Sequence, residues 1–334
     1  MTAHVEHLNT AGLPGRRSGQ LFGQLALVAA SVLVAVSPLQ AGAQSAGEQP
    51  AISLPFTRQH EVHSRVNGQE YRVLVALPVG YGSGLPSDTA RYPVLYVLDG
   101  NDELPVVAEA LRMLRLDAQD NKERWAGYPD VIIVGIGYPV DRFRNTFGLR
   151  ATDYTPTSVA AFDSILTFTY GMPARTGGAE AFLRVLRDEI IPLVERSYRT
   201  TDDRGIMGHS AGGLFAAYAL FEAPDLFRRY GILSPSLWWD NSMMFAKEAS
   251  FSRGRTELPK SVFLSVGGLE DTTIMTRPMQ RMVDALRGRG YRGLDLQSHV
   301  FAEENHQSVV GASLTRSLRA LGYVPPPPGS KPDP

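Results

Sequence analysis

The sequence contains no cysteine. This absence excludes disulfide bonds, thiolate metal sites, a cysteine nucleophile and a lipid-modified N-terminal cysteine. An excess of either charge is missing too, because 33 Lys and Arg residues face 34 Asp and Glu residues. No basic run marks a surface for nucleic acid, and we expect no nucleic-acid partner. The chemistry of this chain must therefore use serine, histidine, carboxylates or a bound ion.

Long apolar runs are scarce, and the longest lies near the start of the chain. Leu25 to Val36 form a run of 12 residues, whereas a membrane-spanning helix needs about 20. Arg16 and Arg17 precede the run and Ala41-Gly42-Ala43 follows it, which is typical of a cleaved secretory signal. We predict a signal peptide over residues 1–43, cleaved near Ala43, and a periplasmic or secreted bacterial protein without a stable membrane span. An uncleaved anchor is the alternative, and both Sec and twin-arginine export stay open.

Hydrophobic residues make up 43% of the 334 residues, which is enough for one large domain. Short apolar runs predict strands at residues 94–98, 131–136, 206–207, 230–233 and 262–266, and alternating polar and apolar residues predict a last strand, near an edge of the sheet, at 294–301. Apolar stripes at helical spacing occupy residues 180–196 and 310–321. Strands that alternate with helices predict a mostly parallel α/β sheet with helices on both faces. We place this domain at residues 55–322.

Three segments depart from this rhythm. Arg58 to Val66 and Glu70 to Leu77 alternate polar and apolar residues around Asn67-Gly68, which predicts an N-terminal antiparallel hairpin with a two-residue turn. Residues 139–178 show little strand or helix pattern and predict an irregular, cap-like segment. Residues 323–334 include a run of four prolines and predict a short extended tail outside the core.

A G-x-S-x-G motif, Gly-His-Ser-Ala-Gly, occurs at residues 208–212. The apolar residues 205–207 precede it and the helix-forming run 214–220 follows it. A strand, a sharp turn and a helix in this order are typical of a nucleophile elbow. In such a turn Ser210 projects its hydroxyl as a nucleophile, and the amide of Ala211 can stabilise an oxyanion. The alternative is an ordinary glycine-rich turn between a strand and a helix.

A serine nucleophile needs a general base, for which histidine is the usual choice. Of the seven histidines, only His299 and His306 follow Ser210, as the chain order serine, acid, histidine requires. His299 lies inside a predicted strand, whereas His306 lies in the polar loop after it. Ligands meet open α/β sheets at loops that follow strands. We therefore predict that His306 is the base.

The third member of such a triad should follow the predicted strand at residues 262–266. Two carboxylates, Glu270 and Asp271, lie there. Either could orient the imidazole and stabilise its cationic form, and spacing alone leaves the two open.

A second oxyanion amide should come from the loop after residues 94–98. We favour the amide of Asn101. Asp99 and Asp102 in the same loop raise a metal site as an alternative, but two carboxylates in a turn are more often caps. We expect no metal and no cofactor.

Six separated segments of the sequence, taken in their order along the chain, form a recognisable pattern. They are YPVLYVLDGND (92–102), RATDYTP (150–156), GIMGHSAGGLFAAYAL (205–220), PDLFRRYGILSPSLWW (224–239), GGLED (267–271) and ENHQS (304–308). Together they resemble the esterase family of α/β-hydrolases, which includes siderophore-lactone, feruloyl and acetyl-xylan esterases, S-formylglutathione hydrolases and mycolyltransferases. The resemblance covers about residues 55–322 and implies the α/β-hydrolase fold. It also implies Ser210 as nucleophile, His306 as base and Glu270 as acid, and it supports Asn101 as an oxyanion donor.

The run SPSLWW most resembles the siderophore-esterase branch. Its Trp238 and Trp239 follow a predicted strand end, so they could form an aromatic wall against an acyl or aryl group. One of them could equally belong to the core. Arg142, Arg144 and Arg150 lie in the cap-like segment, where they could meet an anionic substrate or only be solvated.

The leading hypothesis is a serine hydrolase that cleaves carboxylic esters through an acyl-enzyme, with a siderophore lactone as the first substrate to consider. Acyl or feruloyl esters of carbohydrates come second. An acyltransferase would share every catalytic residue. The hypothesis from another class is an inactive binding protein on the same fold, which would have no chemical need for a serine, a histidine and a carboxylate together.

Overall fold

The computed structural model describes residues 53–83, 89–118, 120–139, 143–171 and 174–328. The predicted signal peptide at residues 1–43 and the end of the predicted tail at 329–334 lie outside the described residues. Among the described residues, no helix combines the length and the apolar character needed to cross a bilayer.

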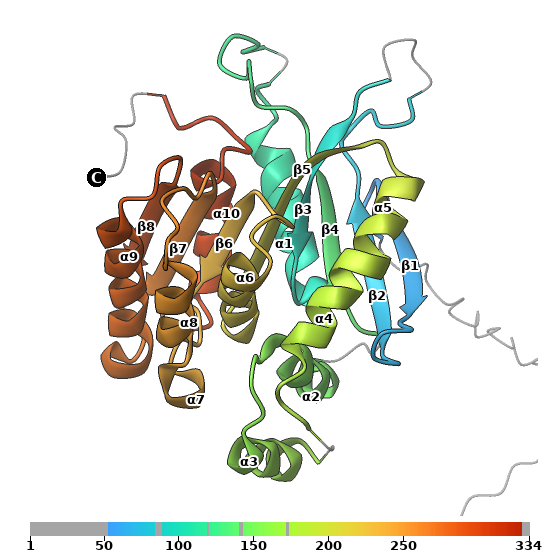
Figure 1. Ribbon diagram of the computed structural model, residues 1–334. Coiled ribbons are helices and arrows are strands. Elements are labelled where there is room, and N and C mark those ends of the chain that lie inside the picture. Colours follow the sequence, from blue (N-terminus) through green and yellow to red (C-terminus); the bar gives the residue numbers. More distant parts are fainter. Residues whose placement is uncertain (1–52, 84–88, 119, 140–142, 172–173, 329–334) are drawn as a thin grey trace, which may run out of the picture. The chain divides into compact units, whose positions relative to one another are not determined.

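One sheet of eight strands, in the order β1-β2-β4-β3-β5-β6-β7-β8, lies at the centre of the described domain (Figure 1). The strands are β1 (Thr57–His63), β2 (Glu70–Ala76), β3 (Tyr92–Val97), β4 (Ile132–Gly137), β5 (Thr200–His209), β6 (Arg229–Leu233), β7 (Ser261–Gly267) and β8 (Asp295–Phe301). β2 pairs antiparallel with β1 and β4, and every other neighbouring pair is parallel. The predicted mostly parallel sheet with an N-terminal antiparallel pair is confirmed.

Helices cover both faces of this sheet. They are α1 (Gly100–Leu114), α2 (Phe143–Tyr154), α3 (Ala160–Tyr170), α4 (Ala179–Val185), η1 (Leu186–Ile190), α5 (Ile191–Ser197), α6 (Ala211–Glu222), α7 (Trp239–Ser242), α8 (Met244–Phe251), η2 (Thr272–Thr276), α9 (Arg277–Arg289) and α10 (Val309–Ala320), where η marks a π-helical turn. The predicted helix at residues 180–196 is the continuous α4–η1–α5 unit, and the predicted C-terminal helix is α10.

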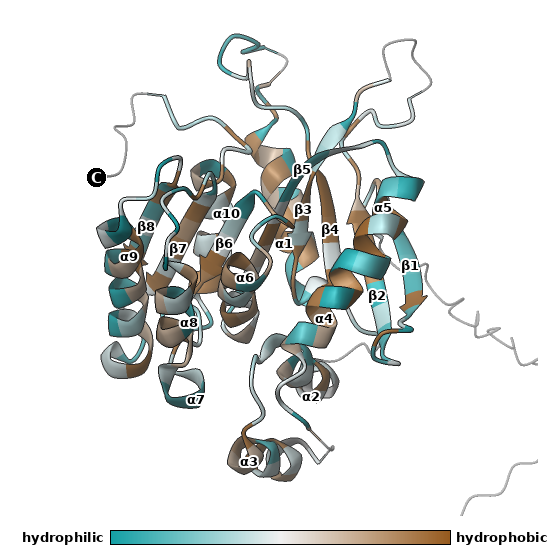
Figure 2. Ribbon diagram, viewed as in Figure 1, coloured by the Kyte–Doolittle hydropathy of each residue, from teal (hydrophilic) through white to brown (hydrophobic). Residues whose placement is uncertain are grey.

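The side-chain alternation of β3 divides the core into two layers. Val94, Tyr96 and Leu98 pack into the layer beneath α4, α6, α8 and α9. Leu95 and Val97 point the other way, into the layer beneath α1 and α10. Because successive side chains of a strand point to opposite faces, a strand covered on both sides must be apolar throughout. Figure 2 shows these central strands as mainly hydrophobic, with hydrophilic stretches on the outer helices.

The predicted two-residue turn between β1 and β2 is wrong. The last paired residues are His63 and Glu70, and the connection is a longer loop closed by the bond from the Ser64 amide to the Gln69 carbonyl. Ser64 is fully buried, and its hydroxyl accepts hydrogen bonds from the amides of Val66 and Asn67. This local bonding ends the strand earlier than the polar–apolar alternation indicated.

The predicted irregular structure of residues 139–178 is also wrong, since α2 and α3 occupy much of the segment. α2 shows no apolar stripe because several of its polar side chains are buried, Arg150 and Asp153 among them. Helix formation there depends on tertiary contacts rather than on a pattern that periodicity can reveal. In Figure 1 both helices lie beyond the edge of the sheet where the parallel strands end, on the same side as α7.

The predicted tail begins later than residue 323. Tyr323 and Val324 are each 2% exposed and belong to the core layer beneath α1 and α10. The amide of Tyr323 also bonds to the carbonyl of Leu318. Only from Pro326 to Pro328 are the described tail residues exposed.

Candidate active site

Ser210 lies at a sharp turn between the end of β5 and the start of α6. Its backbone has φ 61° and ψ −117°, a strained conformation for a residue with a side chain. A Cβ atom on Gly208 would lie 2.7 Å from the carbonyl carbon of Gly212, so the strand and the helix approach too closely for a larger residue. The predicted strand–turn–helix geometry is therefore present, and it projects the Ser210 side chain at the carboxyl edge of the sheet.

His306 lies in the loop between β8 and α10, as the sequence predicted, and its imidazole joins Ser210 to Glu270. Its Nε2 is 2.9 Å from the Ser210 Oγ, and its Nδ1 is 2.5 Å from the Glu270 Oε2. We refer to these three side chains as the Ser210–His306–Glu270 relay. His299 instead lies within β8, where its ring contacts Phe301.

The loops that carry His306 and Glu270 are tied together. The amide of Leu269 donates to the carbonyl of Glu304 over 3.0 Å. A Cβ atom on Gly267 would lie 2.3 Å from the same carbonyl oxygen, so only glycine allows this approach. The contact sets the spacing between the carboxylate and the imidazole through the backbone.

Glu270 is almost completely buried and fully hydrogen-bonded. Its Oε1 accepts hydrogen bonds from the Ser234 hydroxyl over 2.6 Å and from the Gly267 amide over 2.7 Å. Burial alone would raise the pKa of Glu270, but the hydrogen bonds from His306, Ser234 and Gly267 outweigh it and lower the pKa. Asp271 is exposed and caps η2 by accepting from the amides at 273 and 274. Of the two carboxylates left open, the structure thus brings Glu270 to the imidazole.

His209 is a neighbour that sequence reasoning passed over. It is 8% exposed, and its ring centroid lies 4.6 Å from that of His306. Burial, together with the nearby His306, lowers the pKa of His209 to about 3. A neutral ring therefore packs against the His306 imidazole. The signal in the sequence that could have found His209 was its place beside Ser210 in the motif. Ser234, which bonds to Glu270, was missed as well, and its signal was its position at the end of a strand.

The starts of α1 and α6 adjoin each other next to Ser210. Ala211 is the first residue of α6 and Asn101 the second residue of α1, so both amides belong to the first turn of a helix. A Cβ atom on Gly212 would lie 3.5 Å from the Leu98 Cβ, which shows how closely the turn before α1 approaches the elbow. Both predicted oxyanion donors therefore lie at helix N-termini, which favour negative charge.

Arg150 lies beneath the site rather than on an exposed loop. It is 5% exposed, and its Nε and Nη2 each donate to a carboxylate oxygen of Asp99 over 2.8 Å. The expectation that it is a solvated or substrate-facing cation is therefore wrong, because its guanidinium is engaged in a buried ion pair. Arg142 and the side chain of Arg144 lie outside the described part of the chain.

The two tryptophans have different surroundings. Trp239 is 3% exposed, its indole N–H donates to the Thr157 Oγ1 over 3.0 Å, and its ring meets Phe162 of α3 edge-on at 4.9 Å. Trp238 is half-buried, with Phe162 at 6.0 Å. Trp239 therefore anchors α3 to the domain, and Trp238 is the one with surface left for a ligand.

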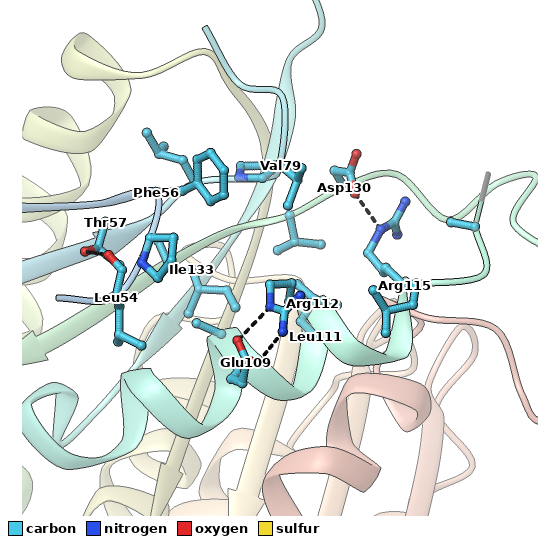
Figure 3. A pocket seen from close by; sticks show the side chains of 18 residues that line it. Leu54, Phe56, Thr57, Val79, Glu109, Leu111, Arg112, Arg115, Asp130 and Ile133 are labelled. Atoms are coloured by element: carbon cyan, nitrogen blue, oxygen red, sulfur yellow. Dashed lines mark hydrogen bonds and ion pairs between the residues drawn. The ribbon is translucent and has the colours of Figure 1, made fainter. Parts of the chain in front are cut away.

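A separate apolar pocket of about 350 Å³ lies elsewhere on the domain (Figure 3). It is lined by residues that precede or begin β1 and β4, by the end of β2 and by the second half of α1. Parallel strands start at that edge of the sheet, whereas Ser210 follows a strand end. Its two arginines already pair, Arg112 with Glu109 and Arg115 with Asp130. Within the described ranges, no group of three or more His, Asp or Glu side chains is arranged to hold a metal ion.

Known proteins resemble this chain over most of its length. A family model described as “Putative esterase” matches residues 64–318. Over 288 residues the chain is 28% identical to the ferri-bacillibactin esterase BesA of Bacillus subtilis, with 82% of this chain and 92% of that protein covered. Over 208 residues it is 31% identical to the siderophore triacetylfusarinine C esterase of Aspergillus fumigatus, with 61% and 63% covered. The crystal structure of the BES protein from Bacillus cereus superimposes with a TM-score of 0.69 at 30% identity, covering 83% of this chain and 98% of that one. The chain belongs to the esterase family.

Proposed function

We propose that this protein is a serine hydrolase that cleaves carboxylic esters, with Ser210 as nucleophile, His306 as general base and Glu270 as the acid of the triad. The observation that carries the proposal is the continuous relay, 2.9 Å from Ser210 to His306 and 2.5 Å from His306 to Glu270. A nucleophile within hydrogen-bond reach of a base that is itself oriented by a third group is the arrangement that activates a serine.

The relay accounts for both halves of the reaction. Ser210 Oγ attacks the ester carbonyl while His306 Nε2 takes its proton, and the amides of Ala211 and Asn101 stabilise the oxyanion. The imidazolium, held by the Glu270 carboxylate, then gives that proton to the departing alcohol. Water enters, loses a proton to His306 and attacks the acyl-enzyme carbonyl, and the acid leaves as Ser210 regains its proton.

For the substrate we propose an ester-linked siderophore. The support is similarity to proteins whose names specify siderophore esters, a ferri-bacillibactin esterase at 28% identity and a triacetylfusarinine C esterase at 31%. The half-buried Trp238 and its neighbour Phe162 offer aromatic surface beside the site for an aryl or acyl group.

Two further assignments accompany this proposal. Residues 1–43 act as a secretion signal and send the enzyme to the periplasm or the exterior, which the apolar run between Arg17 and Ala43 supports. The α2–α3 segment acts as a cap over the site, which its anchoring through Phe162 and Trp239 supports.

Labelling with a fluorophosphonate tests the mechanism, because this probe reacts only with an activated serine. We expect labelling of the wild type and of His299→Ala, a matched histidine outside the relay, and none of Ser210→Ala or His306→Ala. A folded wild type that stays unlabelled would overturn the proposal and favour an inactive binding protein.

A substrate panel then tests the ester class. We expect kcat/KM to be higher for ester-linked siderophores, iron-free or iron-loaded, than for feruloyl and acetyl sugar esters. A reversed order would replace the siderophore assignment with a carbohydrate esterase. Transfer of the acyl group to an added alcohol in preference to water would identify an acyltransferase.

A further inference from the structure

Asp99, the residue before α1, is bonded at every polar group. Its carboxylate receives both hydrogen bonds of the buried Arg150 fork. Its amide donates to the Tyr154 hydroxyl over 3.0 Å, and its carbonyl accepts from the amides of Asp102 and Glu103. Its backbone is left-handed, with φ 52° and ψ 42°, a conformation that is uncommon outside glycine although aspartate adopts it more readily than most residues, and these bonds hold it there.

Asn101 is held by a second set of bonds. Its side chain accepts from the Tyr138 amide over 2.8 Å and donates to the Tyr138 carbonyl over 3.0 Å. The Tyr138 hydroxyl in turn donates to the Asp153 carboxylate over 3.0 Å, as does Tyr71 over 2.9 Å. Tyr71, Tyr138 and Asp153 are each at most 2% exposed, so the contacts among these three side chains are dry and rigid.

Both sets of bonds lead to one helix, α2. Arg150 and Tyr154 are four residues apart and so share a face of α2, and both bind Asp99. Asp153 reaches Asn101 through Tyr138. Between Asp99 and Asn101 runs the backbone that leads into α1 beside the elbow, where a Cβ atom on Gly212 would lie 3.4 Å from Asp99 Oδ2.

Charge adds a second requirement at this turn. Asp99, Asp102 and Glu103 lie within five residues of one another, and burial together with the Asp99 charge raises the pKa of both Asp102 and Glu103. Arg150 is the cation that faces this group. Without it, a buried and unpaired Asp99 carboxylate would oppose the negative charge that develops on the substrate oxygen nearby.

We propose that Arg150 and Tyr154 of α2 are positioning residues for the oxyanion site: they hold Asp99 in its left-handed conformation, aim the Asn101 amide at the substrate oxygen and neutralise the charge behind it. This inference rests on the proposed function. Neither residue touches the substrate, so their effect should fall on the transition state and spare substrate binding.

The test compares an oxygen ester with its thionoester in the full-length enzyme. Sulfur is a poor hydrogen-bond acceptor, so a thionoester gains little from oxyanion donors. We expect Arg150→Met to lower kcat for the oxygen ester by about 100-fold or more, with KM changed less than about threefold, and to lower kcat for the thionoester much less. Tyr154→Phe, which removes one hydroxyl, should produce the same selective loss at roughly tenfold.

The control is Arg289→Met. Arg289 forms an equivalent fork with the buried Glu248, over 2.9 Å for each bond, between α9 and α8. This variant should melt at a lower temperature and keep the oxygen-to-thiono ratio of the wild type. Arg150→Lys retains the charge without the fork. It should therefore regain the melting temperature that Arg150→Met loses, but only part of the wild-type oxygen-to-thiono ratio.

An unchanged oxygen-to-thiono ratio in folded Tyr154→Phe and Arg150→Lys would overturn the inference and leave these residues a purely structural role. That result is distinct from failure of the proposed function, which would appear as an inactive wild type or as an active Ser210→Ala.

Discussion

The site has a relay side, around Ser210, His306 and Glu270, and an α2 side, where helix α2 contacts the Asp99–Asn101 turn. The two sides differ in how their polar groups are held. Around Ser210 the contacts run along loops at the edge of the sheet, and the His306 side chain is 32% exposed. Around Asp99 the ion pair with Arg150 is nearly dry, at 9% and 6% exposure. The relay must exchange protons with substrate and water, whereas the α2 side has only to stay in place. Water and substrate can therefore reach His306, where protons are transferred, but water is excluded from the Asp99–Arg150 pair, which only holds the backbone in place.

The largest expected effect comes from substitutions on the relay side. Ser210→Ala and His306→Ala should each lower kcat by a factor on the order of 10⁴ to 10⁶, and the double variant should lose little more, because the two residues act as a unit. Steady-state kinetics on one ester measures all three. Losses that multiply in the double variant would show that the two side chains act independently.

Glu270→Gln should come next, with kcat lower by about 10³ to 10⁴, because an amide cannot hold the imidazolium or fix its tautomer. Asp271→Asn is the matched control: Asp271 only caps η2, so its loss should leave kcat unchanged and cost at most about 1 kcal/mol of stability. Equal kinetic losses in the two variants would contradict the assignment of Glu270.

The α2 side should respond to pH through Asp153. Burial raises the pKa of Asp153 to about 7, against the lowering effect of its bonds from Tyr71 and Tyr138. The folded protein then holds a proton that the unfolded chain releases near pH 4, so this stabilisation is complete below pH 4 and lost as pH rises to 7. In the wild type the free energy of unfolding should therefore fall by on the order of 4 kcal/mol between pH 4 and pH 7, and Asp153→Asn should abolish this fall. Urea unfolding at several pH values measures it, and an unaltered pH slope would argue against a buried neutral carboxyl.

The relay side should respond in the opposite direction through His209. Its pKa of about 3 lies below the value near 6.5 of an unfolded histidine. The unfolded chain therefore binds the extra proton, so the stabilisation is complete above pH 6.5 and lost as pH falls to 3. His209→Gln should flatten this acid-side loss in the same urea series. A variant that keeps the full loss would place its cause elsewhere.

The smallest expected kinetic effect concerns the aromatic contacts. Trp238→Ala should raise KM for an aryl ester about threefold to tenfold, since a partly exposed ring gives up about 1 kcal/mol of contact. Trp239→Ala should instead lower the free energy of unfolding by about 3–5 kcal/mol, because that ring is buried and anchors α3. Chemical unfolding beside kinetics distinguishes the two, and a KM effect confined to Trp239 would reverse the assignment.

The two sides also differ in how far the sequence predicted them. Ser210 and its elbow could be predicted because strand, glycines and helix are contiguous. His306 could be predicted because chain order left only two histidines, and His306 is the one in the loop after a strand. The α2 side could not be predicted, since Arg150 meets Asp99 across 51 residues and its burial leaves no periodic trace. For the same reason the sequence of α2 suggested irregular structure. Tyr323 was assigned to the tail because prolines follow it, although its ring is part of the core.

Intact-mass measurement of the enzyme during the first turnover of a slow ester tests the central assignment most directly. We expect the mass to rise by one acyl group, peptide mapping to place that group on Ser210, and the adduct to be absent from Ser210→Ala. Turnover in Ser210→Ala, or an acyl group carried by another residue, would contradict the account.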